Sequence, residues 1–380
     1  MLKKRLLTPG PTEVPPDTLA EMAKPVFHHR TKEYQDLFKQ VTEGLQYVFQ
    51  TKNDVLTLCA SGTGAMEAAV VNALAPGDKA VAVVGGKFGE RWAELCKTNG
   101  VETIELNIEW GQAPTPAQIE ALLRKDPKIA AVFITLCETS TGAATDVQAI
   151  GSVVRNHDAL LVVDGISGVG ALPMKTDDWH VDMLIVGSQK ALMMPPGLAF
   201  ITVSPKAWAK IARTPSRSYY FNLPKAKKSL EDFDTPYTPA VTLVRGLKVS
   251  LDMIRAEGIE NVWRRHAVMA QAARAAVKAM GLEGFAAAPS DAVTTVKLPA
   301  GIDGAAVPKK LQAEHGVTIM GGQEKLKGKI VRIAHIGYMD KFDIIVAIAA
   351  LEIVLKKLGA NITLGSGVAA AEEVFFKNNL

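Results

Sequence analysis

Short apolar runs alternate with amphipathic segments through the first half of the chain. Each run is rich in valine, isoleucine, leucine or alanine, and several are followed by a turn and then by residues with helical spacing. The predicted strands are Val55–Cys59, Ala80–Val84, Val101–Leu106, Ala130–Leu136, Leu160–Val163 and Met183–Val186, and the predicted helices include Ala65–Leu74 and Pro116–Arg124. Nearly continuous apolar strands that alternate with helices are typical of a parallel sheet covered on both faces. The pattern therefore predicts an α/β fold whose large domain has a mostly parallel sheet covered by helices.

A different pattern begins near residue 240. It starts with two long helical segments and continues with shorter strands and helices: Val241–Glu257, Asn261–Met280, Asp291–Leu298, Val307–His315, Ile330–Ile336 and Asp343–Leu358. The tail, Gly365–Leu380, is expected to be a loosely held helix. We predict an N-terminal arm over residues 1–20, a large domain over 21–255 and a small α+β C-terminal domain over 256–380.

Composition narrows the class of protein. The chain has 380 residues, 48% hydrophobic and 22% charged, with a net charge of +4, as in an ordinary globular enzyme. Neither a strongly basic surface nor a membrane-length apolar run is evident, so we expect no nucleic-acid or membrane partner. Cys59, Cys96 and Cys137 are widely spaced, and no CxxC motif or zinc-like ligand spacing occurs. We expect a cytoplasmic protein without disulfides or a bound metal.

Five chemically useful residues are predicted at the carboxyl ends of strands, which is where ligands bind in such sheets: Ser61, Phe88, Thr139, Asp164 and Lys190. Asp164 ends one apolar run, and Lys190 lies just past another. A pyridoxal 5'-phosphate (PLP) enzyme requires such a pair. The lysine forms a Schiff base with the cofactor aldehyde, and the carboxylate keeps the pyridine nitrogen protonated so that the ring accepts electrons.

The segment Ser61-Gly62-Thr63-Gly64 lies at a predicted strand-to-helix turn. Backbone N–H groups and the helix dipole at such a turn suit a phosphate group. The segment is neither a complete GxGxxG, because Glu67 occupies the third glycine position, nor a P-loop. Taken alone it fits phosphate binding or a plain tight turn, just as Phe88 fits either stacking on a planar ring or simple packing.

Several blocks together resemble the class V aminotransferases of PLP fold type I, in the alanine–glyoxylate and serine–glyoxylate (serine–pyruvate) branch. The resemblance covers essentially the whole chain. It is carried by Leu7–Thr12, Ala60–Ala68, Glu138–Gly142, Val163–Ser167, Gly187–Ala191 with Pro195–Gly197, Thr235–Val241 and Val331–Ile333. The Ser-Gln-Lys and Thr-Pro-Ala-Val blocks at this spacing are the most specific.

The resemblance implies a role for each matching residue around the cofactor. Lys190 would be the Schiff-base lysine and the acid/base for the proton shift, and Asp164 would pair with the pyridine nitrogen. The phosphate would be held at Ser61, Gly62 and Thr63, assisted by Gln189. Phe88 would stack on the ring, and Thr139 would lie near its ring oxygen.

The resemblance also implies a shared site and a substrate anchor. Thr238 matches a residue that reaches the phosphate from the other subunit, so the active unit should be a homodimer. Thr235 stands where the family usually has a tyrosine, and Tyr237 is a candidate substitute. Arg332 matches the arginine that grips the substrate carboxylate, which suits its fixed fork. The turn at Gly10 should lie near the substrate side chain and favour small donors.

The expected reaction is a ping-pong transfer of an amino group from alanine or serine to glyoxylate or pyruvate. Aspartate or an aminophosphonate would need further cations, for which Arg217, Arg245 and Lys87 are candidates. A cysteine desulfurase would need a histidine in place of Gln189 and a late cysteine, and no cysteine follows Cys137. Two alternatives are not PLP enzymes. One is a non-catalytic hydrogenase-associated subunit. The other is a nicotinamide-dependent dehydrogenase, which is based on the glycine turn alone.

Overall fold

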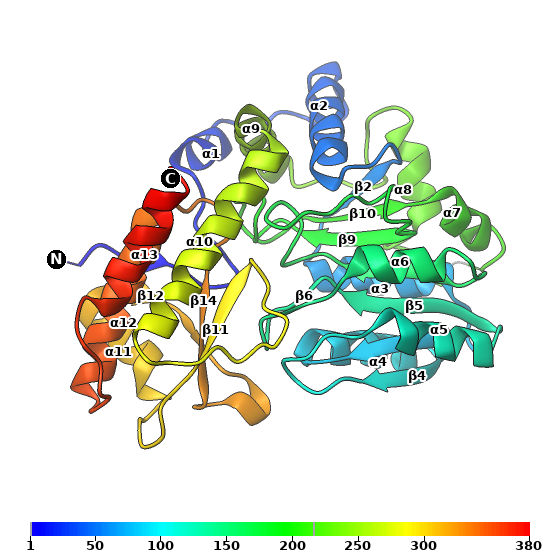
Figure 1. Cartoon of the computed structure of the whole chain (residues 1–380). Helices are drawn as coiled ribbons and strands as arrows, with labels where there is room; N and C mark the ends of the chain where they lie inside the picture. Colours follow the sequence, from blue (N-terminus) through cyan, green and yellow to red (C-terminus); the bar gives the residue numbers. More distant parts are fainter. Residues whose placement is uncertain (1, 216) are drawn as a thin grey trace.

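A seven-stranded sheet forms the centre of the larger part of the molecule (Figure 1). The computed structural model describes residues 2–215 and 217–380. The strand order is β2-β10-β9-β8-β5-β3-β4. Their bounds are β2 Val55–Leu58, β3 Lys79–Val84, β4 Glu102–Asn107, β5 Ile129–Thr135, β8 Leu160–Asp164, β9 Met183–Gly187 and β10 Ala199–Val203. Only β10 runs antiparallel to its neighbours, β2 and β9. The predicted mostly parallel sheet is confirmed.

Helices cover the sheet, with α6 in front and α3 behind it in Figure 1. The helices of this part are α1 Pro16–Met22, α2 Lys32–Phe49, α3 Gly62–Ala73, α4 Lys87–Thr98, α5 Pro116–Lys125, α6 Val147–Val154, α7 Pro205–Ile211 and α8 Leu223–Leu230. Several begin at residues that favour helix starts. Thr115 and Gln118 form a capping box at α5, and the Asp146 side chain caps α6. The sheet and its helices enclose a core centred on residues such as Trp92 and Phe133.

A second hydrophobic core lies in the C-terminal part. It is built around the antiparallel strands β11 (Val293–Lys297), β14 (Ile330–Ala334) and β13 (Met320–Gly321), with β14 in the middle. The helices here are α10 Ile259–Ala279 from Val268 onward, α11 Ala306–His315, α12 Lys341–Lys357 and α13 Ser366–Lys377, with a short 3-10 turn at Glu324–Leu326. Helix α9 Val241–Glu257 and the first turn of α10 pack instead in the core of the large sheet. The division into domains at residues 20 and 255 stays a prediction.

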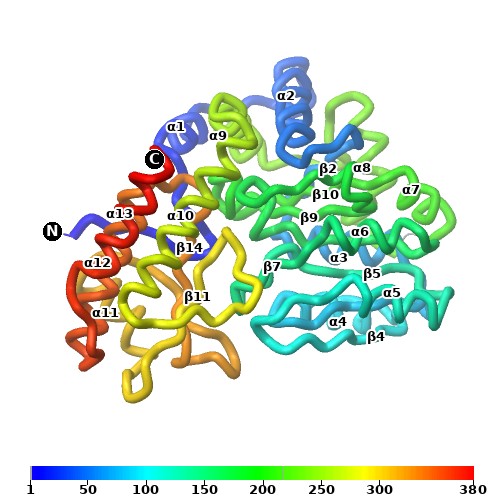
Figure 2. Tube along the Cα trace, viewed as in Figure 1, coloured from blue at the N-terminus to red at the C-terminus, as the bar shows by residue number. Residues whose placement is uncertain are grey.

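The N-terminal arm joins the second core before it reaches the sheet. Strand β1 (Arg5–Leu6) pairs in parallel with β12 (Val317–Thr318), and Leu7 is buried in the second core. Figure 2 shows the arm passing beside α12 and α13 toward the middle of the molecule. The arm therefore enters the space between the two cores. Across residues 2–215 and 217–380, no helix is long and apolar enough to cross a membrane.

The tail differs from the expectation of a loosely held helix, which is wrong. Helix α13 packs along α10, and Ala371 and Phe375 are buried in the second core. These two residues are four positions apart and so lie on one helical face. The buried carboxylate of Glu352 also caps α13, accepting hydrogen bonds from the N–H groups of Gly365 at 2.7 Å and Gly367 at 2.6 Å. One face of α13 is thus firmly packed on the second core.

Candidate active site

The five predicted strand-end residues lie at one edge of the sheet. Ser61 follows β2, Phe88 follows β3, Thr139 follows β5, Asp164 is the last residue of β8, and Lys190 follows β9. These strands all run in the same direction, so their carboxyl ends meet at this edge. The placement predicted from the sequence is confirmed, although their chemical roles stay a prediction.

The N-terminal arm closes over the Lys190 side chain. Lys190 Nζ donates a hydrogen bond to the carbonyl oxygen of Pro9, 181 positions away. Thr12 fixes the arm here, since its hydroxyl donates to the Lys190 carbonyl at 2.7 Å and its N–H donates to the Gln189 carbonyl at 3.1 Å. Burial lowers the pKa of Lys190 to about 8, and the Asp164 charge offsets only part of that effect. Near neutral pH a useful fraction of this amine is therefore uncharged.

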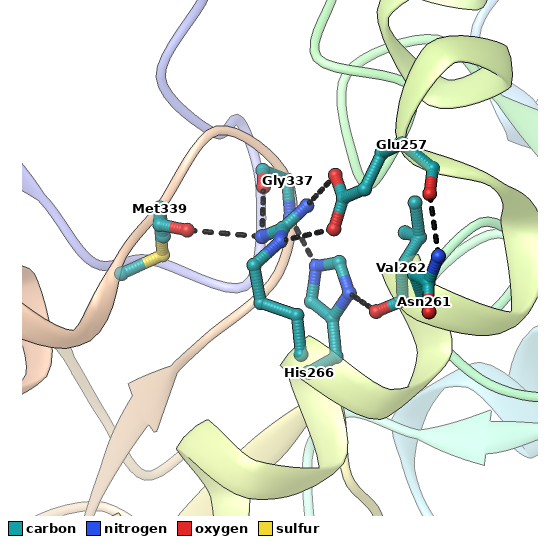
Figure 3. A network of polar contacts seen from close by, with 7 residues as sticks. Glu257, Asn261, Val262, His266, Gly337 and Met339 are labelled. Carbon is teal, nitrogen blue, oxygen red and sulfur yellow. Dashed lines mark hydrogen bonds and ion pairs between the residues drawn. The ribbon is translucent and has the colours of Figure 1, made fainter. Parts of the chain in front are cut away.

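A polar network around His266 holds the loop that carries Gly337 and Met339 (Figure 3). The Gly337 N–H donates to His266 Nε2 at 3.0 Å, which leaves His266 Nδ1 to donate to the Val262 carbonyl at 2.7 Å. Burial lowers the pKa of His266 to about 3, so its ring is neutral. A Cβ on Gly337 would stand 3.3 Å from the Lys190 carbonyl oxygen. The loop that carries Gly337 thus packs directly behind Lys190.

Asp164 is a buried carboxylate with one oxygen still available. Its side chain is 3% exposed, and Oδ1 accepts a hydrogen bond from the Ile166 N–H at 2.8 Å. No hydrogen bond reaches Oδ2 from any residue that the structure describes. Burial raises the pKa of Asp164 to about 6, so the group is mostly ionised at neutral pH. A protonated ring nitrogen would satisfy this oxygen.

The start of α3 offers free hydrogen-bonding groups for an anion. Ser61 precedes the helix, but its side chain makes no capping hydrogen bond, and the hydroxyl of Thr63 accepts from Arg91 Nη1 at 3.2 Å. A Cβ on Gly62 would lie 2.4 Å from Ile166 Cδ1, so this turn packs tightly against the strand β8 loop. Gln189 directly precedes Lys190. Its side-chain oxygen Oε1 is buried and has no hydrogen-bond partner within the described residues. This amide oxygen therefore still has room for a hydrogen-bond donor.

Phe88 and Thr139 are held from different sides. Phe88 lies half-buried in the first turn of α4, and the Arg91 guanidinium stands 5.1 Å from its ring centroid. The Thr139 hydroxyl donates to Ser167 Oγ at 2.7 Å. Both side chains are therefore fixed before any ligand arrives.

Arg332 extends from β14 in the second core toward this edge. It is only 3% exposed, and it donates from Nε to the Gly321 carbonyl and from Nη1 to the Thr139 carbonyl, both at 3.0 Å. Burial lowers the pKa of Arg332 to about 10, so it is still charged at neutral pH. Among the described residues no carboxylate forms an ion pair with it. A buried cation without an ion-pair partner is costly, and a bound carboxylate would relieve that cost.

Within residues 2–215 and 217–380, no hydrogen bond or ring contact joins Thr235, Tyr237 or Thr238 to this cluster. The Thr235 hydroxyl donates to the Tyr237 carbonyl at 2.7 Å, and the Tyr237 hydroxyl donates to the Tyr219 carbonyl at 2.7 Å. The Tyr237 ring stacks on Tyr220 at 5.2 Å, and Thr238 is exposed. Their predicted contact with a cofactor stays a prediction.

Three further groups contact the predicted site residues and were not found from the sequence. They are the Pro9 carbonyl, Arg91 and the buried carboxylate of Glu138, which lies in one of the blocks that carry the resemblance. A charged residue two positions after the predicted strand Ala130–Leu136 is the signal that could have found Glu138. A backbone carbonyl has no side-chain signal at all.

Comparisons with known proteins agree with this arrangement. The family model for class-V aminotransferases matches residues 6–341. The chain belongs to this family. A soluble hydrogenase small subunit from Synechococcus is 42% identical over 379 residues, covering 98% of each chain. A serine–glyoxylate aminotransferase from Methylorubrum extorquens is 37% identical over 391 residues, covering 100% of this chain and 97% of the other.

A solved structure extends the likeness to the fold. The ureidoglycine–glyoxylate aminotransferase of Bacillus subtilis superposes with a TM-score of 0.93 at 32% identity, and 99% of each chain is covered. Class-V aminotransferases depend on PLP, so this chain is a PLP-dependent transaminase of fold type I, as predicted. The residues present fit that cofactor, because Asp164 Oδ2 lacks the donor that a protonated ring nitrogen would provide, and the uncapped start of α3 lacks the anion that a phosphate would provide.

Proposed function

We propose that this class-V aminotransferase transfers an amino group from a small amino acid, alanine or serine, to glyoxylate or pyruvate in two half-reactions. The names of the relatives support the acceptor, since the Methylorubrum and Bacillus proteins both act with glyoxylate. The observation that carries the proposal is Arg332, a buried guanidinium without an ion-pair partner in the described parts of the chain. Its planar fork suits the carboxylate that amino acids and 2-keto acids share.

Lys190 supplies the acid/base chemistry in this proposal. Its pKa of about 8 lies near the operating pH, so Nζ can take the proton from the substrate Cα as a general base and give it back as a general acid. The Pro9 carbonyl holds this nitrogen in place. Bound PLP supplies the aldehyde that takes up the amino group and a ring that accepts the electron pair left on Cα. Asp164 favours that acceptance because its free oxygen holds a proton on the ring nitrogen.

The remaining site residues would hold the cofactor. Gly62 and Thr63, with Ser61 before them, offer N–H and hydroxyl groups to the phosphate, and the dipole of α3 adds to the attraction. Gln189, beside Lys190, would donate from its side-chain amide NH2 group to the phosphate. Phe88 would cover one face of the ring, and Thr139 would stand at its edge.

The surroundings favour a small, uncharged donor side chain. Gly10 leaves no room for a side chain beside Lys190, because a Cβ there would meet the lysine. The three cations considered for a second acidic group are engaged elsewhere. Arg245 pairs with Glu21 at 2.8 Å, Lys87 pairs with Glu90 at 2.9 Å, and Arg217 donates to the carbonyls of Leu74 and Asn99. Aspartate and aminophosphonates are therefore disfavoured.

The active unit in this proposal is a cytoplasmic homodimer. Thr238 is exposed, and beside its segment Tyr219 and Tyr220 expose 75% and 44% of their surface. A second copy of the chain seated on these rings would bring its Thr238, with Thr235 and Tyr237, to the phosphate of the first copy. The three free cysteines support the cytoplasmic location.

A visible-absorption titration tests the function. Purified protein loaded with PLP is mixed with alanine, serine or aspartate in the absence of an acceptor. Bleaching of the yellow band by alanine or serine, and its return with glyoxylate or pyruvate, is the expected result. Unchanged transaminase activity in Lys190→Ala, or a protein that never turns yellow with PLP, would refute the assignment, and the second outcome would favour a partner protein.

A further inference from the structure

Glu138 is a buried acid for which the proposed reaction has no use. Its side chain is 6% exposed, and it lies in the short strand β6 (Cys137–Glu138), directly after β5. Burial raises the pKa of Glu138, while hydrogen bonds from Ser140, Gly89 and Phe88 oppose that shift. Burying a carboxylate is expensive unless its oxygens are well bonded. The hydrogen bonds that offset this cost show which parts of the site Glu138 holds in place.

The Glu138 carboxylate accepts four hydrogen bonds, and two of them come from the first turn of α4. Oε2 accepts from the N–H groups of Phe88 at 3.1 Å and Gly89 at 2.9 Å. Oε1 accepts from the N–H and the hydroxyl of Ser140, at 3.2 and 2.5 Å. The Ser140 hydroxyl in turn accepts from the Lys87 N–H at 3.0 Å. Helix α4, whose N-cap Gly86 has no side chain, is therefore capped from another loop.

The fit between the two loops is close. A Cβ on Gly86 would stand 2.5 Å from both Glu138 Cδ and Ser140 Oγ, so only glycine allows this approach. The turn that carries Phe88 is thereby seated directly on the Glu138 carboxylate. These bonds fix the backbone of Phe88, and therefore the point from which its ring extends.

The residue between Glu138 and Ser140 reaches the other parts of the site. The Thr139 carbonyl accepts from Arg332 Nη1 at 3.0 Å, and its hydroxyl donates to Ser167, three residues after Asp164. One tripeptide thus contacts the Phe88 turn, the Asp164 loop and the arginine from the second core. The negative charge of Glu138 also favours the charged form of Arg332.

We propose that Glu138 is a positioning residue, which fixes the ring-stacking Phe88 relative to the Arg332 carboxylate anchor through the Glu138-Thr139-Ser140 segment. The inference rests on the proposed function for the roles of Phe88 and Arg332. It assigns no contact between Glu138 and the substrate. Its consequence is that loss of the carboxylate disturbs cofactor binding and substrate binding together.

Glu138→Gln removes the charge and keeps the shape. One oxygen becomes an NH2 group, which must then face N–H donors on one side or the other. We expect the dissociation constant for PLP to rise about 10- to 100-fold, as for an unmet hydrogen bond to a charged group. The visible circular dichroism of bound PLP should weaken, because that signal depends on how the ring is held. The KM for the amino donor should rise and kcat should fall.

Glu352→Gln is the matched control. Glu352 is also a buried carboxylate, 2% exposed, that caps a helix through two backbone N–H groups, but it does so at α13 in the second core. It should lower the thermal stability of the apoprotein as Glu138→Gln does, with PLP affinity and circular dichroism unchanged within about twofold. Equal PLP affinity and equal dichroism in Glu138→Gln and the wild type would reduce Glu138 to a structural cap and overturn the inference.

Two provisions keep the test decisive. If Glu138→Gln does not fold, Ser140→Ala removes the linked hydroxyl, and wild-type PLP affinity and dichroism in that variant would overturn the inference. Failure of the proposed function has a different signature. A wild-type protein that binds PLP but transaminates none of the donors refutes the function, while the dichroism of Glu138→Gln still decides the role of Glu138.

Discussion

Gly10 lies in contact with the Lys190 side chain, so closely that a Cβ on Gly10 would stand 2.4 Å from both Cε and Nζ. The backbone at Gly10 has φ +141°, which side-chain-bearing residues avoid. The N-terminal arm therefore approaches the reactive nitrogen as backbone alone. This explains why a glycine stands 180 positions before the lysine that it touches.

Gly10→Ala should displace the Lys190 side chain and weaken PLP uptake at least about tenfold, since overlap and backbone strain together exceed about 1.4 kcal/mol. Titration of the apoprotein with PLP, followed by visible absorption, measures this. Gly77→Ala is a suitable control, because Gly77 also has a positive φ, +87°, but no atom lies within 4 Å of the added Cβ. If both variants take up PLP like the wild type, the arm does not constrain Lys190.

The reactivity of Lys190 should follow its lowered pKa. Nζ is a nucleophile only when neutral, so the rate of PLP uptake by the apoprotein should rise about tenfold per pH unit and level off near pH 8. An unperturbed lysine, with its pKa of 10.5, would keep rising beyond pH 10. Stopped-flow absorption across pH 6–10 distinguishes the two profiles, with Lys190→Ala as the unreactive control. A midpoint above about 10 would show that burial does not control this amine.

Much of the fold follows from local patterns, and the exceptions have physical causes. Strands β3, β5, β8 and β9 and helix α9 begin and end close to the predicted positions, because each is a clear apolar run or an amphipathic repeat. Strand β10 was missed because its run, Ala199–Val203, directly follows the Pro195-Pro196-Gly197 block. Helix α2 was missed although its buried positions have regular spacing, since its many polar residues resemble those of a surface segment.

The site residues also separate into those that the sequence predicts and those that it does not. Asp164 and Lys190 could be found because residues at the ends of parallel strands share one sheet edge. The acceptor for Lys190 Nζ could not, because it is a carbonyl oxygen on the arm, brought there by the pairing of β1 with β12. The links of Arg332 to Thr139 and of Glu138 to the Phe88 turn also join segments distant in sequence. No local pattern encodes such contacts.

Arg332→Lys should separate charge from geometry in carboxylate binding. Lysine retains the positive charge but cannot keep both carbonyl contacts and a two-point grip on a carboxylate. We expect KM for the amino donor to rise about 10- to 100-fold, equal to about 1.4–2.8 kcal/mol, while PLP affinity is retained. Arg274→Lys is the control, since Arg274 already pairs with Asp291 at 2.8 Å. Equal KM values in all three proteins would remove Arg332 from the substrate site.

Subunit mixing tests whether Thr238 serves the partner's site. Thr238→Glu places a negative charge on an exposed position, and in the proposed dimer that charge would repel the phosphate of the other subunit. Lys190→Ala and Thr238→Glu should each be inactive alone. A mixed dimer would then contain one site with both changes and one with neither. Equimolar unfolding and refolding together should restore about one quarter of the wild-type activity, because half of the dimers are mixed and each has one intact site. If Thr238 acts within its own chain, each site of a mixed dimer carries one defect, and no activity should return.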